Sequence, residues 1–112
     1  MQLYVELWNA KQPWLDLSPE ERQTYFDMVG EEIGKLTDAG IDLVGFAING
    51  ENTSNRSNHR YLAVWKMPTT DHVKMLEDSV SQAGWYKYFD QVNAGGELIP
   101  PPAALDDMIN MK

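Results

Sequence analysis

The chain has 112 residues, which is the size of one compact domain and too short for two. Its net charge of -8 and its lack of a Lys/Arg cluster argue against nucleic-acid and anionic-membrane partners, because both attract basic surfaces. The absence of cysteine excludes disulfides, thiolate catalysis and cysteine-based metal sites.

The opening MQLYVELWNA has neither the basic start of a signal peptide nor the long apolar run of a membrane span, so we expect a cytoplasmic protein. Residues 3–8 instead alternate between two kinds of side chain. This pattern predicts a strand with two different faces: Leu3, Val5 and Leu7 on one, and Tyr4, Glu6 and Trp8 on the other.

A helix is predicted between Ser18 and Gly40. The segment SPEER provides Ser18 as N-cap, Pro19 at the first helical position and Glu21 to complete a capping box. Apolar residues then follow at spacings of three and four as far as Leu36, and Gly40 is a helix stop.

Two strands, a second helix and a last strand follow. IDLVGFAIN (41–49) and RYLAVWKM (60–67) are short and rich in branched and aromatic residues, which favours strands. GENTSNRSNHR between them has no apolar residue and predicts a long, exposed, mobile loop. The second helix is predicted from Thr69 or Thr70 to Ala83-Gly84. The segment WYKYFDQVN (85–93) is predicted to form the last strand, and Gly95-Gly96 a turn.

The order βαββαβ is typical of the ferredoxin-like arrangement, an α+β fold in which an antiparallel four-stranded sheet carries two helices on one face. Residues 1–98 are expected to form this domain, and residues 99–112 a Pro-rich tail with a short helix. We expect the other face of the sheet to carry the aromatic residues Tyr4, Trp8, Tyr61 and Trp65, or their neighbours. Such a patch is too large to face water, so we expect a homodimer in which a second copy covers it.

The run AVWKMPTTDHVKMLEDSV, residues 63–80, resembles the third strand and second helix of the dimeric α/β-barrel superfamily, which includes monooxygenases of antibiotic biosynthesis. The resemblance implies a sheet-to-sheet dimer and a pocket between each sheet and its helices. Haem-degrading members carry an Asn on the first strand, where Asn9 stands here. Their helical Trp and His positions hold Lys74, Met75 and Leu76, so we expect no haem and no other cofactor.

Other chemistries lack their motifs. His59 and His72 are the only histidines, and no spacing of His, Asp or Glu typical of a metal site is present, so no metal is expected. No glycine-rich phosphate loop and no nucleophile motif of a serine hydrolase occurs.

The remaining candidate is a pocket for a flat aromatic molecule, lined by indoles and phenols with a few polar groups. Its candidate residues are Trp8, Asn9, Trp14, Tyr61, Trp65, Trp85 and Tyr86. Glu6 or His59 would act as general base on an aromatic or ketonic metabolite, in a cofactor-independent oxygenase, whose phenolate reduces oxygen, or in an isomerase.

The alternative is a non-catalytic ligand-binding or interaction module, in which the same aromatics fill the core and the dimer interface. A buried Glu6 needs a polar partner, and Arg60, Lys66 and His59 lie on or beside the neighbouring third strand. Glu6 is then either half of a cross-strand ion pair or the polar group of a pocket.

Overall fold

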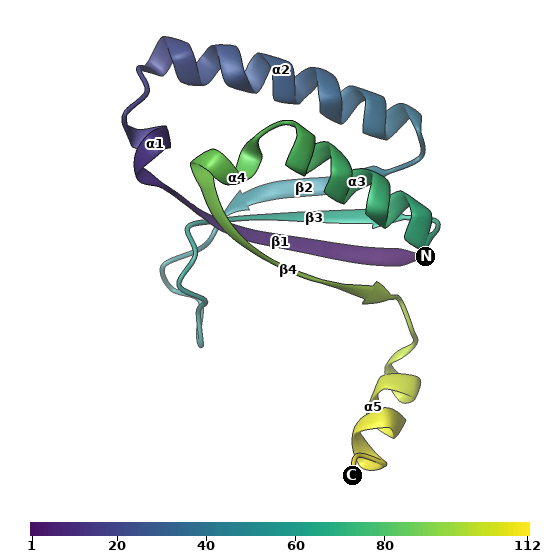
Figure 1. Cartoon of the computed structure of the whole chain (residues 1–112). Helices are drawn as coiled ribbons and strands as arrows, with labels where there is room; N and C mark the ends of the chain where they lie inside the picture. The colour runs from purple at the N-terminus through teal and green to yellow at the C-terminus, as the bar shows by residue number, and fades with distance from the viewer.

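A computed structural model describes all of residues 1–112 as a four-stranded antiparallel sheet with five helices (Figure 1). The strands are β1 (Gln2–Ala10), β2 (Asp42–Ile48), β3 (Tyr61–Met67) and β4 (Phe89–Glu97), and they lie in the order β2-β3-β1-β4. The helices are α1 (Gln12–Leu15), α2 (Pro19–Asp38), α3 (Thr70–Gln82), α4 (Trp85–Tyr88) and α5 (Pro101–Ile109). The α+β class is therefore confirmed. The long helices α2 and α3 cover the same face of the sheet, as predicted (Figure 1).

The ends of α2 and α3 follow from local sequence. The Ser18 hydroxyl accepts the Glu21 backbone N–H at 3.1 Å, and the Glu21 carboxylate accepts the Ser18 N–H at 2.9 Å. Gly40 has φ +98°, a conformation that ends a helix and favours glycine. Thr69 caps α3 by accepting the His72 N–H at 3.3 Å. Both predicted helices are confirmed.

The predicted last strand begins too early. Residues 85–88 form α4, which follows Gly84 at φ +73°, and β4 starts only at Phe89. The aromatic residues that suggested a strand pack into the core instead: the Trp85 and Phe89 rings lie 4.1 Å apart between centroids. The prediction of a turn at Gly95-Gly96 is also wrong, because both residues lie in β4 opposite Tyr4 and Leu3.

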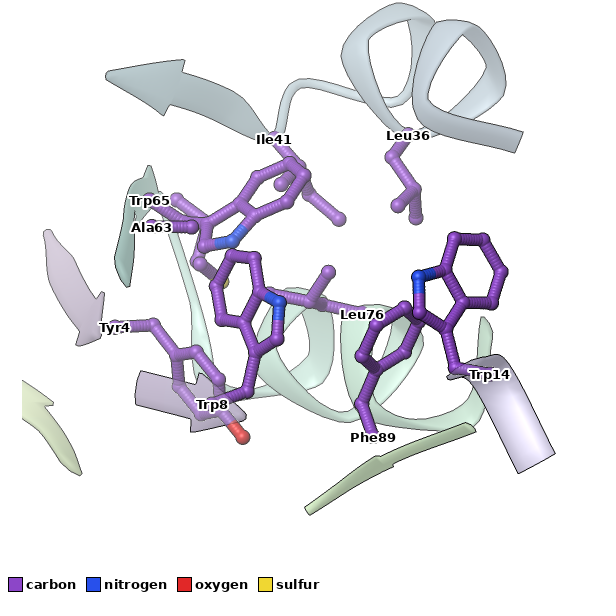
Figure 2. Close-up of a cluster of buried hydrophobic side chains, with 10 residues drawn as sticks. Tyr4, Trp8, Trp14, Leu36, Ile41, Ala63, Trp65, Leu76 and Phe89 are labelled. Atoms are coloured by element: carbon purple, nitrogen blue, oxygen red, sulfur yellow. The ribbon is translucent and has the colours of Figure 1, made fainter. Parts of the chain in front are cut away.

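The two faces of the sheet are the reverse of the prediction. The aromatic residues expected on the open face lie under the helices, where Tyr4, Trp8 and Trp65 are buried (Figure 2). Alternation along a strand separates two sets of side chains without saying which set the helices cover, and the large rings fill the space beneath α2 and α3. The uncovered face is mainly aliphatic; we call it the open face, and it carries Leu3, Val5, Leu7, Leu62, Val64 and Val92, together with Lys66 at one end of β3.

The loop between β2 and β3 is irregular and mostly exposed, as predicted, and side chains tie it together. The Arg56 guanidinium donates to the Gly50 carbonyl at 3.2 Å. The Asn9 side chain joins the loop to β1, donating to the Asn58 carbonyl and accepting the Arg60 backbone N–H, both at 2.8 Å.

None of the five helices combines the length and the apolar character that crossing a membrane requires.

Replacing Gly95 by alanine is expected to destabilise the protein, because a Cβ there would meet the Leu3 carbonyl oxygen and the Tyr4 ring at 3.0 Å. We expect Gly95→Ala to lower the free energy of unfolding by about 1–3 kcal/mol in urea titrations. The matched control is Gly96→Ala, whose Cβ would have no neighbour within 4 Å. Equal stability of the two variants would contradict this close contact.

Candidate functional site

A hollow lies between α2 and the helix-covered face of the sheet. It consists of two neighbouring pockets: one of about 520 Å³, which we call the outer chamber, and one of about 50 Å³ beside Glu6 and α3, which we call the inner chamber. Both chambers are lined by a shared set of side chains: Trp8, Val29, Ile33, Phe46 and Trp85. The outer volume lies in the range of small-molecule sites, and the inner one has room for a water-sized polar group.

The outer chamber is aromatic and has no charged side chain in its lining. The Trp8 ring stacks on Tyr61 at 5.9 Å between centroids with 27° between the planes, and it meets the edge of Trp85 at 5.6 Å. Phe46 meets the same Trp8 ring at 81°. Walls of this kind favour a flat, apolar molecule.

The inner chamber holds the only buried charged side chain, Glu6, which is 5% exposed. Its Oε1 accepts the Trp65 indole N–H at 2.5 Å, and its Oε2 accepts the Gln91 amide N–H at 2.9 Å. Both oxygens of the carboxylate are therefore held by uncharged donors from neighbouring strands.

The expectation that Glu6 pairs with Arg60, Lys66 or His59 is wrong. Glu6 forms no ion pair, and its hydrogen bonds go to Trp65 and Gln91. Lys66 lies opposite Leu3 in the β1–β3 register and so belongs to the other face. The Arg60 guanidinium instead donates to the Tyr61 hydroxyl at 3.1 Å.

A second indole fixes the orientation of Gln91. Trp85 Nε1 donates to Gln91 Oε1 at 2.8 Å, and an indole can only donate, so the amide nitrogen of Gln91 must face Glu6. Trp65 likewise has no acceptor to offer. The surroundings of Glu6 therefore match an ionised carboxylate, which accepts on both oxygens.

Burial and hydrogen bonding act on Glu6 in opposite directions. Desolvation raises the pKa of the carboxyl above its ordinary value, while the bonds from Trp65 and Gln91 lower it, and the raising effect is larger. A carboxylate with a raised pKa is a stronger base than one in water. The inner chamber thus combines a proton acceptor with space for the group that would give up the proton.

Comparison with known protein families gives a match over nearly the whole chain. A family model described as a family of unknown function, DUF6616, matches residues 1–111. The chain belongs to the DUF6616 family. No curated protein matches it. The description of the family names no chemistry, so the chemistry of this DUF6616 chain must be argued from its own side chains.

The structure gathers part of the predicted site. The predicted residues that line the hollow are Glu6, Trp8, Trp14, Tyr61, Trp65 and Trp85. Three others do not line it: Asn9 bonds to the loop, Tyr86 is exposed, and His59 lies in the loop with a buried Nδ1 that has no partner.

Sequence reasoning missed Phe46 and Gln91. Phe46 belongs to a strand that was predicted correctly, but its place in the wall depends on the β2–β3 register, which sets it opposite Ala63. Gln91 lies on β4 opposite Trp8 of β1, and Trp8 is the next residue after Glu6 on the same face of β1. Neither pairing has a local signal, so only knowledge of the register could have identified them.

The stability of this DUF6616 protein is expected to carry a pH dependence that comes from Glu6. Since the pKa of folded Glu6 is raised, the folded chain holds this proton more tightly than the unfolded chain does. The stabilisation is complete below the unfolded pKa of about 4.5 and is lost as the pH rises through the folded pKa.

Urea unfolding of the parent and of Glu6→Gln at a series of pH values measures this effect, because every other titrating group cancels in the difference. The parent should lose stability relative to Glu6→Gln as the pH rises from about 4 towards 8. A difference that stays constant with pH, or one that changes in favour of the parent, would contradict the raised pKa.

Proposed function

We propose that this DUF6616 protein binds a flat, largely apolar molecule in the hollow and that Glu6 removes a proton from it without a cofactor. One observation carries the proposal: a buried carboxylate with no cationic partner lies in the lining of the inner chamber, which shares lining side chains with the aromatic outer chamber. Structural carboxylates at this depth are normally paired with a cation, because burying an unpaired one costs several kcal/mol.

The proposed chemistry follows from the position of Glu6 beside the two chambers. The ring system of the ligand occupies the outer chamber, and its acidic O–H or C–H reaches into the inner one. The bond to hydrogen breaks, the proton passes to a Glu6 oxygen, and the electron pair stays on the ligand as a phenolate or enolate. Such an anion is the intermediate of a cofactor-independent isomerase or oxygenase acting on an aromatic or ketonic molecule.

We further propose that the domain is ferredoxin-like and belongs to the dimeric α/β-barrel superfamily. The topology supports this assignment: β3 lies between β1 and β2, and β1 lies between β3 and β4, so both βαβ units are split.

We also propose that the protein is a homodimer through its open face. This face presents aliphatic side chains on the two central strands, including Val5 and Leu7 on β1 and Leu62 and Val64 on β3. An uncovered apolar sheet of this kind favours packing against a second sheet, and a two-fold axis lets the same residues meet one another. The dimer thus keeps the predicted mode of association but uses the aliphatic side of the sheet.

Two bicyclic probes of similar size test the proposed function. The phenol 2-naphthol should quench the tryptophan fluorescence of the hollow, and Glu6→Gln should weaken its binding about tenfold or more, since a hydrogen bond to a carboxylate is lost. The ketone 2-tetralone should exchange its α-hydrogens with deuterium in the presence of the protein, and Glu6→Gln should slow this exchange at least about tenfold, as measured by proton NMR.

The control is Glu31→Gln, which removes the same charge from an exposed position on α2 outside the hollow and should leave both readings unchanged. Binding of 2-naphthol without catalysed exchange of 2-tetralone would indicate that the protein is a non-catalytic ligand-binding module. Exchange that persists in Glu6→Gln would remove Glu6 as the base.

The dimer is tested by Val64→Asp, which puts a charge in the middle of the open face. We expect this variant to be a monomer by light scattering while the parent is a dimer, because a carboxylate cannot be buried unpaired between two sheets. Met75→Asp is the control, as it introduces the same charge at an exposed apolar position on α3. Dimers in both variants would exclude the open face as the interface.

A further inference from the structure

The two chambers of the hollow follow one another along the length of α2. Of these two chambers, Leu36 lines only the inner one, whereas Ile33 and Val29 line both. Phe26 and Gly30 line only the outer chamber. From Phe26 to Leu36 the helix rises about 15 Å, at about 1.5 Å for each residue. The hollow is therefore elongated, and its two ends lie under different turns of the same helix.

The strands beneath α2 give the same order. On β3, Trp65 lines only the inner chamber and Tyr61 only the outer one, and about 13 Å of strand separates them at about 3.3 Å for each residue. On β1, Glu6 lines only the inner chamber, whereas Trp8 lines both. The long axis of the hollow thus follows the strands, which lie lengthwise beneath α2 (Figure 1).

The end of the hollow away from Glu6 is apolar and has room for more than a bicyclic molecule. The outer chamber of about 520 Å³ holds about 17 water-sized groups at about 30 Å³ each. No charged side chain lines it, and the rings of Trp14, Phe26 and Tyr61 form part of its wall. A ligand that fills the whole hollow therefore has one polar end, at Glu6, and a long apolar body.

Gly30 is the one residue in the lining of the outer chamber that has no side chain. It lies four residues after Phe26 and three residues before Ile33, so position 30 is on the same face of α2 as both. A Cβ built there would have no neighbouring atom within 4 Å. The backbone of α2 is therefore open to the outer chamber at this point.

No packing contact requires glycine at position 30. In the interior of a helix glycine is less stable than alanine, and what it permits in return is a close approach of another backbone or of a ligand. No other element approaches Gly30 closely. Space for a ligand accounts for the missing side chain, because a larger residue would fill part of the outer chamber between Phe26 and Ile33.

We propose that Gly30 determines the length of the ligand that the hollow accepts. The ligand is an elongated molecule that lies along the strands, with its acidic end at Glu6 and its far apolar end against the backbone of α2 at Gly30. This inference rests on the proposed ligand site, but it does not depend on Glu6 acting as a base.

Two ligands that differ only in length test this role. The compound 6-butyl-2-naphthol carries its butyl chain at the end of the rings opposite the hydroxyl, and 2-naphthol lacks the chain. In fluorescence titrations the parent should bind the butyl compound about tenfold more tightly or better, since the chain buries more apolar surface. Gly30→Leu should bind the two compounds within about twofold of each other, because its side chain fills the space that the butyl chain would occupy.

Gly34→Leu is the matched control. Gly34 lies on the same helix and also has free space for a Cβ, but it belongs to the lining of neither chamber. Leucine favours a helix more than glycine does, so both variants should stay folded. Gly34→Leu should keep the preference of the parent for the butyl compound. A preference that survives in Gly30→Leu, or that is lost equally in both variants, overturns the role of Gly30.

Failure of the proposed function gives different results. Exchange of 2-tetralone that persists in Glu6→Gln would remove Glu6 as the base without changing the preference for the butyl compound. A parent that binds neither naphthol would overturn the ligand site, and this inference with it. A parent that binds both naphthols equally would keep the ligand site but overturn the elongated ligand.

Acrylamide quenching tests the direction of a side chain at position 30 without a ligand. Trp8, Trp14 and Trp85 line the outer chamber together with Gly30. Gly30→Leu should lower the quenching constant of the tryptophan fluorescence about twofold, because its side chain occupies the space through which acrylamide reaches the indoles. Gly34→Leu should leave this constant unchanged. Equal constants in the two variants would place the added side chain outside the hollow and overturn the proposal.

Discussion

The hydrogen bonds to the Glu6 carboxylate are the constraint around which the rest of the site is organised. A buried carboxylate without a cation is tolerated only if its oxygens are satisfied, and Trp65 and Gln91 satisfy both of them. These bonds join three strands, β3, β1 and β4, on the helix-covered face. Through Gln91 they also hold the indole of Trp85, so one polar group orients two walls of the hollow.

The hollow and the uncovered surfaces share an origin in the one-sided architecture of the domain. Both long helices lie on one face, and rigid rings that meet edge to face beneath them leave space that flexible aliphatic side chains would fill. The two central strands present mainly aliphatic side chains on the other face, and α5 extends on that side (Figure 1). A dimer that covers the open face would bury these side chains.

The success of sequence reasoning depended on how local each signal was. The ends of α2 were predictable because Ser18, Glu21 and Gly40 act within one turn of the chain. The start of β4 was not, because the aromatic content of residues 85–88 serves the core rather than a strand. The tryptophans of the walls were among the predicted residues, but Phe46 was not. The partners of Glu6 were not predicted, since Gln91 reaches it only through the pairing of β1 with β4.

The sequence by itself determined the order of the four strands and the two long helices, the ends of those helices, and the difference between the two sides of β1, because capping and alternation are properties of neighbouring residues. Only the tertiary structure decided that the helices cover the side with Tyr4, Glu6 and Trp8, and that Glu6 is held by an indole and an amide rather than by a cation. Those outcomes depend on strand register and on helix packing, and both are contacts between residues far apart in the chain.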